Sequence, residues 1–192
     1  GWASVILDDD TLKMWYSADN EPDNIWGIGY AWSLDGTSWT RYSGNPVMNK
    51  MYSWERDIGQ PVVLKDGNLY RMWYHGWSTL EPVAVGYATS PDGKNWTRNE
   101  NPVMENDFGS KNTSQIGLWS VIKIGNIFAG WYYWTNSSWS EDWQNGKAYI
   151  SYATSGDGIS WQDHGTCVSC GDSDWEADFV LTPLVTKSDV TV

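Results

Sequence analysis

Apolar and polar residues alternate in short runs along most of this chain. The segment 61–76, PVVLKDGNLYRMWYHG, holds two apolar runs on either side of Asp66-Gly67, a pair typical of a hairpin turn. The segments 83–90 (VAVGYATS) and 96–103 (WTRNENPV) flank a second such pair, Asp92-Gly93. None of these runs has the 3.6-residue period of an amphipathic helix. The pattern therefore predicts a unit of four short antiparallel strands.

The four-strand unit recurs along the chain. A tryptophan returns every 58 residues, at Trp15, Trp73 and Trp131. The Asp-Gly pair returns with it, beginning at Asp35, Asp92 and Asp157, and the tetrapeptide NPVM occurs at both 45–48 and 101–104. Self-similarity at a fixed period is the mark of a repeat architecture. The chain is therefore about three copies of one unit of roughly 58 residues.

Repeated four-stranded sheets of this length predict an all-β fold made of β-propeller blades. A β-sandwich is the alternative, but it does not account for the regular recurrence. We expect one partial propeller domain over 1–192, with blades near 1–48, 53–104 and 108–170 and a fourth beginning within 174–192. Propellers close with four to eight blades. Further blades, or other copies of the chain in a homo-oligomer, are therefore expected to cover the open edge.

The motif Ser-x-Asp-Gly-x-x-Trp occurs three times, most clearly as SPDGKNWTR at 90–98. Asp suits a tight turn because its side chain bonds to the backbone, and Gly suits it because it tolerates positive φ. We interpret the motif as the structural turn between the third and fourth strands. The acidic run at 8–10 is interpreted as a solvated turn on the same face.

Long and variable connections gather on the opposite face. Those between the second and third strands span 17–26, 75–83 and 134–147, and those leading into the next unit span 49–60, 105–117 and 171–178. Binding residues are concentrated on loops that a rigid scaffold positions. We therefore expect the functional site on this face.

Charge and composition narrow the ligand class. The formal net charge is −12, which argues against a nucleic-acid backbone or an anionic membrane as partner. The acidic surface is compatible with a neutral ligand or a structural calcium ion, and no cofactor is required. Apolar runs stay well below the ~18 residues of a spanning helix. An extracellular or periplasmic location is favoured, although no targeting segment decides it.

Cys167 and Cys170 form one C-x-x-C pair. A zinc site needs about four ligands, and His75 and His164 are the only histidines. A short-range disulfide or two idle thiols are therefore the favoured interpretations, and no metal site is predicted.

Tryptophan is unusually abundant, with 16 residues. Half occupy repeated positions and are expected to pack within blades. Indoles beside carboxylates suit carbohydrate, because rings stack on the C–H faces of sugars while acids bind the hydroxyls. We expect the substrate-binding residues to be Trp26, His75, Trp77, Gln115, Trp134, Trp139 and Trp143. Loop packing, or a solvated histidine in the case of His75, is the alternative for these positions.

The segment from PVVLKDGNLYRMWYHGW to VAVGYATSPDGKNWTRNENPVM resembles the repeat of the five-bladed propeller glycosidases, the arabinanase/β-xylosidase and invertase/levansucrase superfamily. The resemblance covers nearly the whole chain and is specific for the blade. It implies carboxylates at the axial ends of the first strands: a base or nucleophile, a general acid and a third that tunes the acid. Two such carboxyls lie roughly 5–5.5 Å apart for retention and 6.5–9.5 Å apart for inversion of the sugar stereochemistry.

The general acid of that superfamily is commonly a Glu two positions before a Pro. Here those positions are Gly59 and Leu181, and the third copy offers Gln115. The resemblance therefore points to nearby carboxylates, with Asp57 as base or nucleophile and Glu176 as general acid. Glu55 and Asp178 are the alternates. The structural interpretation is that Trp-Glu-x-Asp caps the turn into the first strand through backbone N–H groups.

Two functions follow from the resemblance. The first is a glycoside hydrolase-like enzyme that cleaves a plant or microbial polysaccharide or oligosaccharide with paired carboxylates. The second is a non-catalytic carbohydrate-binding or assembly module built from the same blades. The fold alone does not choose between them.

Overall fold

The computed structural model describes residues 2–20, 25–77, 84–105, 107–111, 113, 115–136, 147–171 and 183–186. The chain divides into two compact units, Gly1–Val103 and Met104–Val192. In the described part, three four-stranded antiparallel sheets account for the strands, as expected for blades of an incomplete propeller. The all-β prediction is confirmed, and the one helical element described is a short 3₁₀ turn, η1 (Phe108–Ser110).

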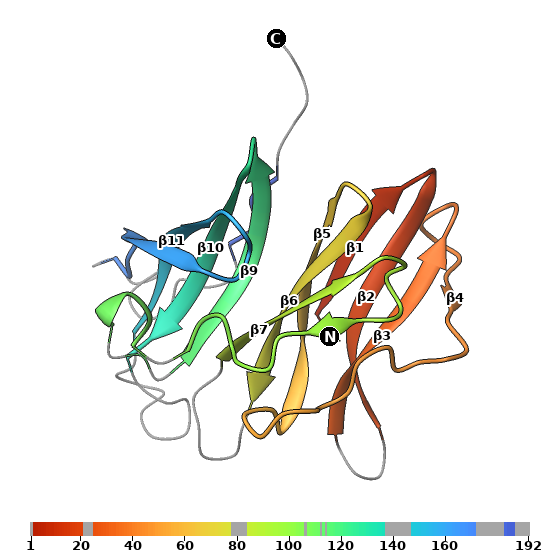
Figure 1. Cartoon of the computed structure of the whole chain (residues 1–192), viewed down its shortest axis with the longest axis horizontal. Helices are drawn as coiled ribbons and strands as arrows, with labels where there is room; N and C mark the ends of the chain where they lie inside the picture. The colour runs from red at the N-terminus through yellow and green to blue at the C-terminus, as the bar shows by residue number, and fades with distance from the viewer. Residues whose placement is uncertain are drawn as a thin grey trace. The chain divides into compact units, whose positions relative to one another are not determined.

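The first unit contains two sheets whose strands follow chain order (Figure 1). The first sheet consists of β1 (Ala3–Asp8), β2 (Thr11–Asn20), β3 (Ile25–Ser33) and β4 (Thr40–Arg41). The second consists of β5 (Asp57–Asp66), β6 (Leu69–Trp77), β7 (Ala84–Ser90) and β8 (Thr97–Arg98). The order confirms the four-strand unit expected from the repeat.

The second unit contains the third sheet, with the same strand order. It consists of β9 (Gln115–Ile124), β10 (Ile127–Thr135), β11 (Ala148–Ser155) and β12 (Trp161–Val168). No helix in the described part of the chain is both long and apolar enough to cross a bilayer.

The strands run further than the sequence predicted. Residues 17–20 continue β2 and residues 25 and 26 begin β3, so the connection assigned to 17–26 is mostly strand. The second strand likewise extends to Trp77 in the second sheet and to Thr135 in the third. β5 begins at Asp57, four residues before the proline expected to start it. Polar residues in these stretches predicted loops, but the antiparallel strand pairing continues through them.

The Ser-x-Asp-Gly motif is a structural turn in all three sheets, as expected. In the second sheet Ser90 Oγ accepts a hydrogen bond from Gly93 N at 2.8 Å. Asp92 Oδ1 accepts from the backbone N–H groups of Lys94 and Asn95 at 2.8 Å each. Trp96 Nε1 donates to Gly93 O at 3.2 Å, and Gly93 has φ of 75°. The other copies, at Asp35 and Asp157, repeat these bonds.

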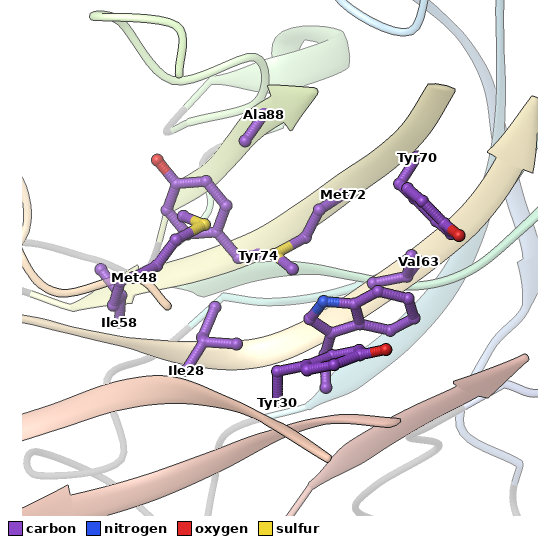
Figure 2. Close-up of a cluster of buried hydrophobic side chains, with 10 residues drawn as sticks. Ile28, Tyr30, Met48, Ile58, Val63, Tyr70, Met72, Tyr74 and Ala88 are labelled. Carbon is purple, nitrogen blue, oxygen red and sulfur yellow. The ribbon is translucent and has the colours of Figure 1, made fainter. Parts of the chain in front are cut away.

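The core of the first unit lies between its two sheets. Trp15 is fully buried, its ring packs against Tyr30, Tyr70 and Trp96, and its Nε1 donates to Gly93 O at 2.7 Å. Trp15 belongs to a cluster of buried side chains from both sheets. Figure 2 shows Ile28, Tyr30, Ile58, Val63 and Met72 of this cluster. The turn between β7 and β8 of the second sheet therefore also accepts the buried tryptophan of the first sheet.

The acidic run at 8–10 is only partly a solvated turn, so that interpretation was wrong for Asp8. Asp9 and Asp10 form the β1–β2 turn with positive φ, whereas Asp8 is the last residue of β1. The Asp8 carboxylate lies 2.6 Å from Lys13 Nζ and 3.3 Å from Lys65 Nζ, and it accepts a hydrogen bond from the Tyr70 hydroxyl. It therefore joins the two sheets of the first unit.

Substitution of Gly93 tests the role of the turn in core packing. A Cβ there would lie 2.7 Å from the Trp15 ring, whereas a Cβ at Gly67 meets nothing within 4 Å. Both glycines have positive φ, so both alanine variants carry backbone strain of about 1 kcal/mol. We expect Gly93→Ala to lower the free energy of unfolding by a further ~1–3 kcal/mol, measured by urea denaturation. Equal losses in the two variants would contradict the packing role.

Substitution of Asp8 tests the charged contact between the sheets. Hydrogen bonds from Lys13 and then Tyr70 lower the pKa of the Asp8 carboxyl to about 2. Its stabilisation is therefore complete above pH ~4 and is lost as the pH falls toward 2. We expect Asp8→Asn to lower the free energy of unfolding by about 1 kcal/mol at pH 7 and to flatten its decline between pH 4 and 2. Asp10→Asn is the matched control, and an identical profile for both variants would disprove the assignment.

Candidate functional site

The candidate site lies at the start of β5, the first strand of the second sheet. Asp57 is the first residue of that strand, whereas the sequence analysis placed it in the connection at 49–60 that leads into the strand. Its Oδ1 accepts a hydrogen bond from Trp26 N at 3.1 Å, its Oδ2 lies 3.6 Å from Arg56 Nε, and its side chain is 16% exposed. The carboxylate is therefore fixed in place but still reachable by a ligand.

A β-bulge follows Asp57 and shapes the site. The register with β6 shifts between Gly59 and Val62, and Gln60 has φ of 48°. Gln60 N donates to Ser17 Oγ at 2.7 Å, which holds the bulge against β2. Backbone strain and bulges of this kind cluster at functional sites. Within the described part of the chain, the buried side-chain Oε1 of Gln60 has no hydrogen-bond partner.

The position of the usual general acid is filled by Gly59, and the structure supplies the reason. A Cβ at Gly59 would lie 2.8 Å from Ser17 Oγ and 3.3 Å from the Trp77 ring. A glutamate at this position would require the Ser17 hydroxyl to move and the Trp77 ring to shift slightly. The space that an acid would use is taken by the serine that holds the bulge.

Two predicted indoles border Asp57. Trp26 lies at the start of β3 and donates its backbone N–H to the carboxylate, while Trp77 is the cross-strand neighbour of Asp57 at the end of β6. Both side chains are half-buried. The structure therefore places Asp57 beside the backbone of Trp26 and opposite Trp77 on the neighbouring strand.

The predicted position of His75 was wrong. His75 lies inside the second sheet, paired with Gly59 of β5 and Val85 of β7, and is fully buried rather than in a loop. Its ring lies 6.0 Å from that of Trp77 in an edge contact. His75 therefore packs against the Trp77 ring.

The candidates in the second unit are described separately. Gln115 is the first residue of β9, half-buried, and its Oε1 lies 3.5 Å from the Tyr133 hydroxyl. Trp134 lies in β10, stacks on Tyr149 at 4.4 Å and donates to Ser151 Oγ at 3.0 Å. Its ring is therefore engaged in packing within its own sheet. The remaining candidates, Trp139, Trp143, Glu176 and Asp178, lie outside the described residues.

Glu55 has a structural role. Its side chain is fully buried and accepts hydrogen bonds from Met51 N at 2.7 Å, Tyr52 N at 3.0 Å and the Tyr74 hydroxyl at 2.8 Å. It also forms an ion pair with Arg98 of β8. The interpretation that Trp-Glu-x-Asp caps the turn before the first strand is confirmed for this residue. Burial raises the pKa of the neighbouring Tyr74.

The sequence analysis missed two contributors, Ser17 and Gln60. Ser17 fell in a stretch assigned to a loop, and the positive φ of Gln60 has no signal in the sequence. Among the described residues, no group of three or more His, Cys, Asp or Glu side chains is placed to hold a metal ion. The Asp57 carboxylate can accept hydrogen bonds from a neutral ligand, and the half-buried indoles of Trp26 and Trp77 leave ring surface for stacking.

Comparison with known proteins supports the fold. No protein-family profile matches the chain. It is 30% identical over 199 residues to two uncharacterised proteins of Mycobacterium tuberculosis, Rv1502 and MT1551, and the match covers 95% of this chain. The chain spans 61% of the length of these relatives.

Solved structures similar to the chain are consistently glycoside hydrolases. A glycoside hydrolase matches with a TM-score of 0.69 and 21% identity over 91% of this chain and 55% of its own. A second match comes from the GH130 family of mannoside phosphorylases, described as containing glycoside hydrolases that target β-1,2-mannosidic linkages in Candida mannan. Its TM-score is 0.60 and its sequence identity 18%, over 88% of this chain and 52% of its own. The GH32 β-fructofuranosidase of Bombyx mori matches with a TM-score of 0.60 and 17% identity, over 84% of this chain and 36% of its own. The chain shares their propeller-like fold.

The contrast between Glu55 and Asp57 gives a testable prediction. We expect Glu55→Gln to lower the free energy of unfolding by about 3 kcal/mol, because it leaves the Arg98 charge without its buried partner. Asp57→Asn, two residues away, should change it by less than about 1 kcal/mol, because that carboxylate is partly solvated. Urea denaturation of both variants measures the difference. Equal destabilisation would refute the division of roles.

Proposed function

We propose that this chain is a carbohydrate-active propeller module that binds saccharide at the start of β5. The observation that carries the proposal is the part-exposed Asp57 carboxylate, which accepts a hydrogen bond from the backbone N–H of Trp26 and is paired across the strands with Trp77. The shared fold with glycoside hydrolases supports the same ligand class. The net charge of −12 favours a neutral saccharide over an anionic one.

The chemistry of each group suits a sugar. A carboxylate accepts hydrogen bonds from hydroxyl donors. The indoles supply apolar area for the C–H face of a pyranose or furanose ring. A saccharide satisfies both kinds of group at once, whereas an apolar ligand would leave the acceptors without donors.

Hydrolysis of glycosidic bonds in a plant or microbial polysaccharide or oligosaccharide is the first candidate for the activity. Asp57 would serve as base or nucleophile, and Glu176 as general acid, with Asp178 as its alternate. The accessibility of Asp57 at the strand start supports this assignment. Glu55 is no longer an alternate catalytic carboxylate, because its oxygens already accept structural hydrogen bonds.

Saccharide binding without turnover is the second candidate. It is favoured by the glycine at the usual acid position, Gly59, where a Cβ would lie 2.8 Å from Ser17 Oγ. The stacking and hydrogen-bonding groups are the same in both candidates. Binding and turnover must therefore be measured side by side.

We expect the chain to bind arabinan, xylan or fructan oligosaccharides, as measured by isothermal titration calorimetry. Trp77→Ala should weaken binding on the order of tenfold, since it removes roughly 60 Å² of apolar contact. Trp32→Ala is the matched control, because that indole is exposed at the other end of β3 from Trp26. Equal affinity in wild type and Trp77→Ala would refute the site.

Release of reducing sugar from the same oligosaccharides separates the two candidates. If the chain is a hydrolase, Asp57→Asn and Glu176→Gln should each reduce turnover at least a hundredfold. Turnover that survives both changes would eliminate these residue roles. Binding without turnover in the wild type would select the second candidate.

A further inference from the structure

Arg98 is a buried side chain that holds the connection leading into the candidate site. It is the last residue of β8, and its side chain is 6% exposed. Its Nη1 donates to Asn49 O at 2.7 Å, at the beginning of the connection, and its Nη2 forms an ion pair with Glu55 near the end. One guanidinium therefore binds both ends of the segment 49–55.

Two tyrosines surround this guanidinium. The Tyr74 hydroxyl accepts a hydrogen bond from Arg98 Nη2 at 2.9 Å and donates one to Glu55 Oε1 at 2.8 Å. Arg98 Cζ lies 5.0 Å from the centre of the Tyr74 ring and 5.3 Å from that of Tyr52, as in cation–π contacts. Arg98, Glu55 and Tyr74 form what we call the entry clamp of the second sheet, because the connection they hold leads into β5.

The entry clamp ends next to Asp57. Glu55 Oε2 accepts hydrogen bonds from the backbone N–H groups of residues 51–52, so the turn before the strand is closed around this carboxylate. Arg56 N then donates to Trp77 O, and Asp57 begins β5. Only Arg56 therefore separates the clamped glutamate from the carboxylate of the candidate site.

The third sheet has an equivalent clamp in which the charges are exchanged. Tyr132 follows Tyr74 by 58 residues. Lys111 Nζ donates to the Tyr132 hydroxyl at 2.9 Å and forms an ion pair with Asp163, and the two charged side chains are 12% and 14% exposed. The cation here lies on the connection and the carboxylate on the outer strand, β12. Lys111, Asp163 and Tyr132 are therefore the entry clamp of the third sheet.

The exchange of charges shows what the two clamps have in common. They share their place in the repeat and their bonds to a tyrosine hydroxyl, but not the sign of the charge on the connection. Each holds the connection that enters a first strand, and these strands begin at Asp57 and Gln115. The shared role is therefore to fix the beginning of a first strand, which in the second sheet is the site carboxylate.

We propose that Arg98 is a positioning residue for the saccharide site, which acts through Glu55 to hold Asp57 within reach of Trp26 N. A group that binds a ligand must be held within about 0.5 Å of its productive position by its supporting residues. Arg98 can supply this support because all three of its guanidinium nitrogens donate hydrogen bonds inside the clamp. The consequence for binding rests on the proposed function, whereas the position of Asp57 can be measured without a ligand.

Hydrogen exchange of the Trp26 amide tests the proposal, because that N–H donates to Asp57 Oδ1 at 3.1 Å. We expect Arg98→Gln to accelerate exchange of this amide at least tenfold in NMR measurements, as Asp57→Ala does, because the charged acceptor is lost from its position. The amides of β6 report the overall stability of the second sheet and should accelerate less. Unchanged exchange of Trp26 in Arg98→Gln, or equal acceleration of Trp26 and the β6 amides, would overturn the proposal.

Asp163→Asn is the matched control, because it breaks the ion pair of the other entry clamp. We expect faster exchange of the Ser110 and Lys111 amides, which lie on the connection held by that clamp. Exchange of the Trp26 amide should stay at the wild-type rate. Acceleration of Trp26 as large as in Arg98→Gln would show a general loss of stability and would also overturn the proposal.

Two milder variants keep the test independent of the folding of Arg98→Gln. Arg98→Lys retains the charge beside Glu55 but loses the fork of donors, so it should accelerate the Trp26 amide less than Arg98→Gln does. Tyr74→Phe removes only the hydroxyl that Arg98 and Glu55 share, and we expect an acceleration of about threefold. A wild-type exchange rate in Tyr74→Phe would contradict transmission through the clamp.

Saccharide titration connects the clamp with the proposed function. For the arabinan, xylan or fructan oligosaccharide that the wild type binds, the Kd of Arg98→Gln should rise at least tenfold, while that of Asp163→Asn stays unchanged. Faster exchange of Trp26 with an unchanged Kd would remove Arg98 as a positioning residue for binding. A wild type that binds none of these oligosaccharides would overturn the proposed function, and the exchange rates would still decide whether Arg98 positions Asp57.

Discussion

The burial of Trp15 against the turn of the neighbouring sheet is the constraint on which the first unit depends. Its indole N–H must find an acceptor once it leaves water, and Gly93 O provides one at 2.7 Å. That carbonyl is held in place because Ser90 and Asp92 satisfy the N–H groups of the turn. The repeated Ser-x-Asp-Gly motif therefore serves the packing between sheets as well as the turn within one.

The sequence predicted the strands and their order because their signals are local. Alternation and Asp-Gly turns can be recognised from neighbouring residues, and the 58-residue period from a comparison of the sequence with itself. The strand ends were underestimated because polar side chains there are satisfied across sheets. Ser17 accepts from Gln60 N, 43 residues away, and Asp8 accepts from Tyr70, 62 residues away. Such partners cannot be identified before the sheets are placed together.

The candidate site was predicted only in part, because it too depends on contacts between residues distant in the sequence. Asp57, Trp26 and Trp77 were identified from residue type and were found together at the start of β5. Glu55 and Asp57 look interchangeable in the sequence, yet one is enclosed by Arg98 and Tyr74 and the other remains accessible. The strained bulge at Gln60 and the collision that excludes a side chain at Gly59 are properties of the tertiary structure.

The internal copy of Trp-Glu-x-Asp bears on the role of Glu176. A general acid must hold a proton near neutral pH, whereas an arginine partner stabilises the charged carboxylate. In the copy at 54–57 the glutamate is paired with Arg98 and the aspartate faces the candidate site. By sequence correspondence Glu176 matches Glu55 and Asp178 matches Asp57. Asp178 is therefore the better match to a carboxylate that a ligand can reach.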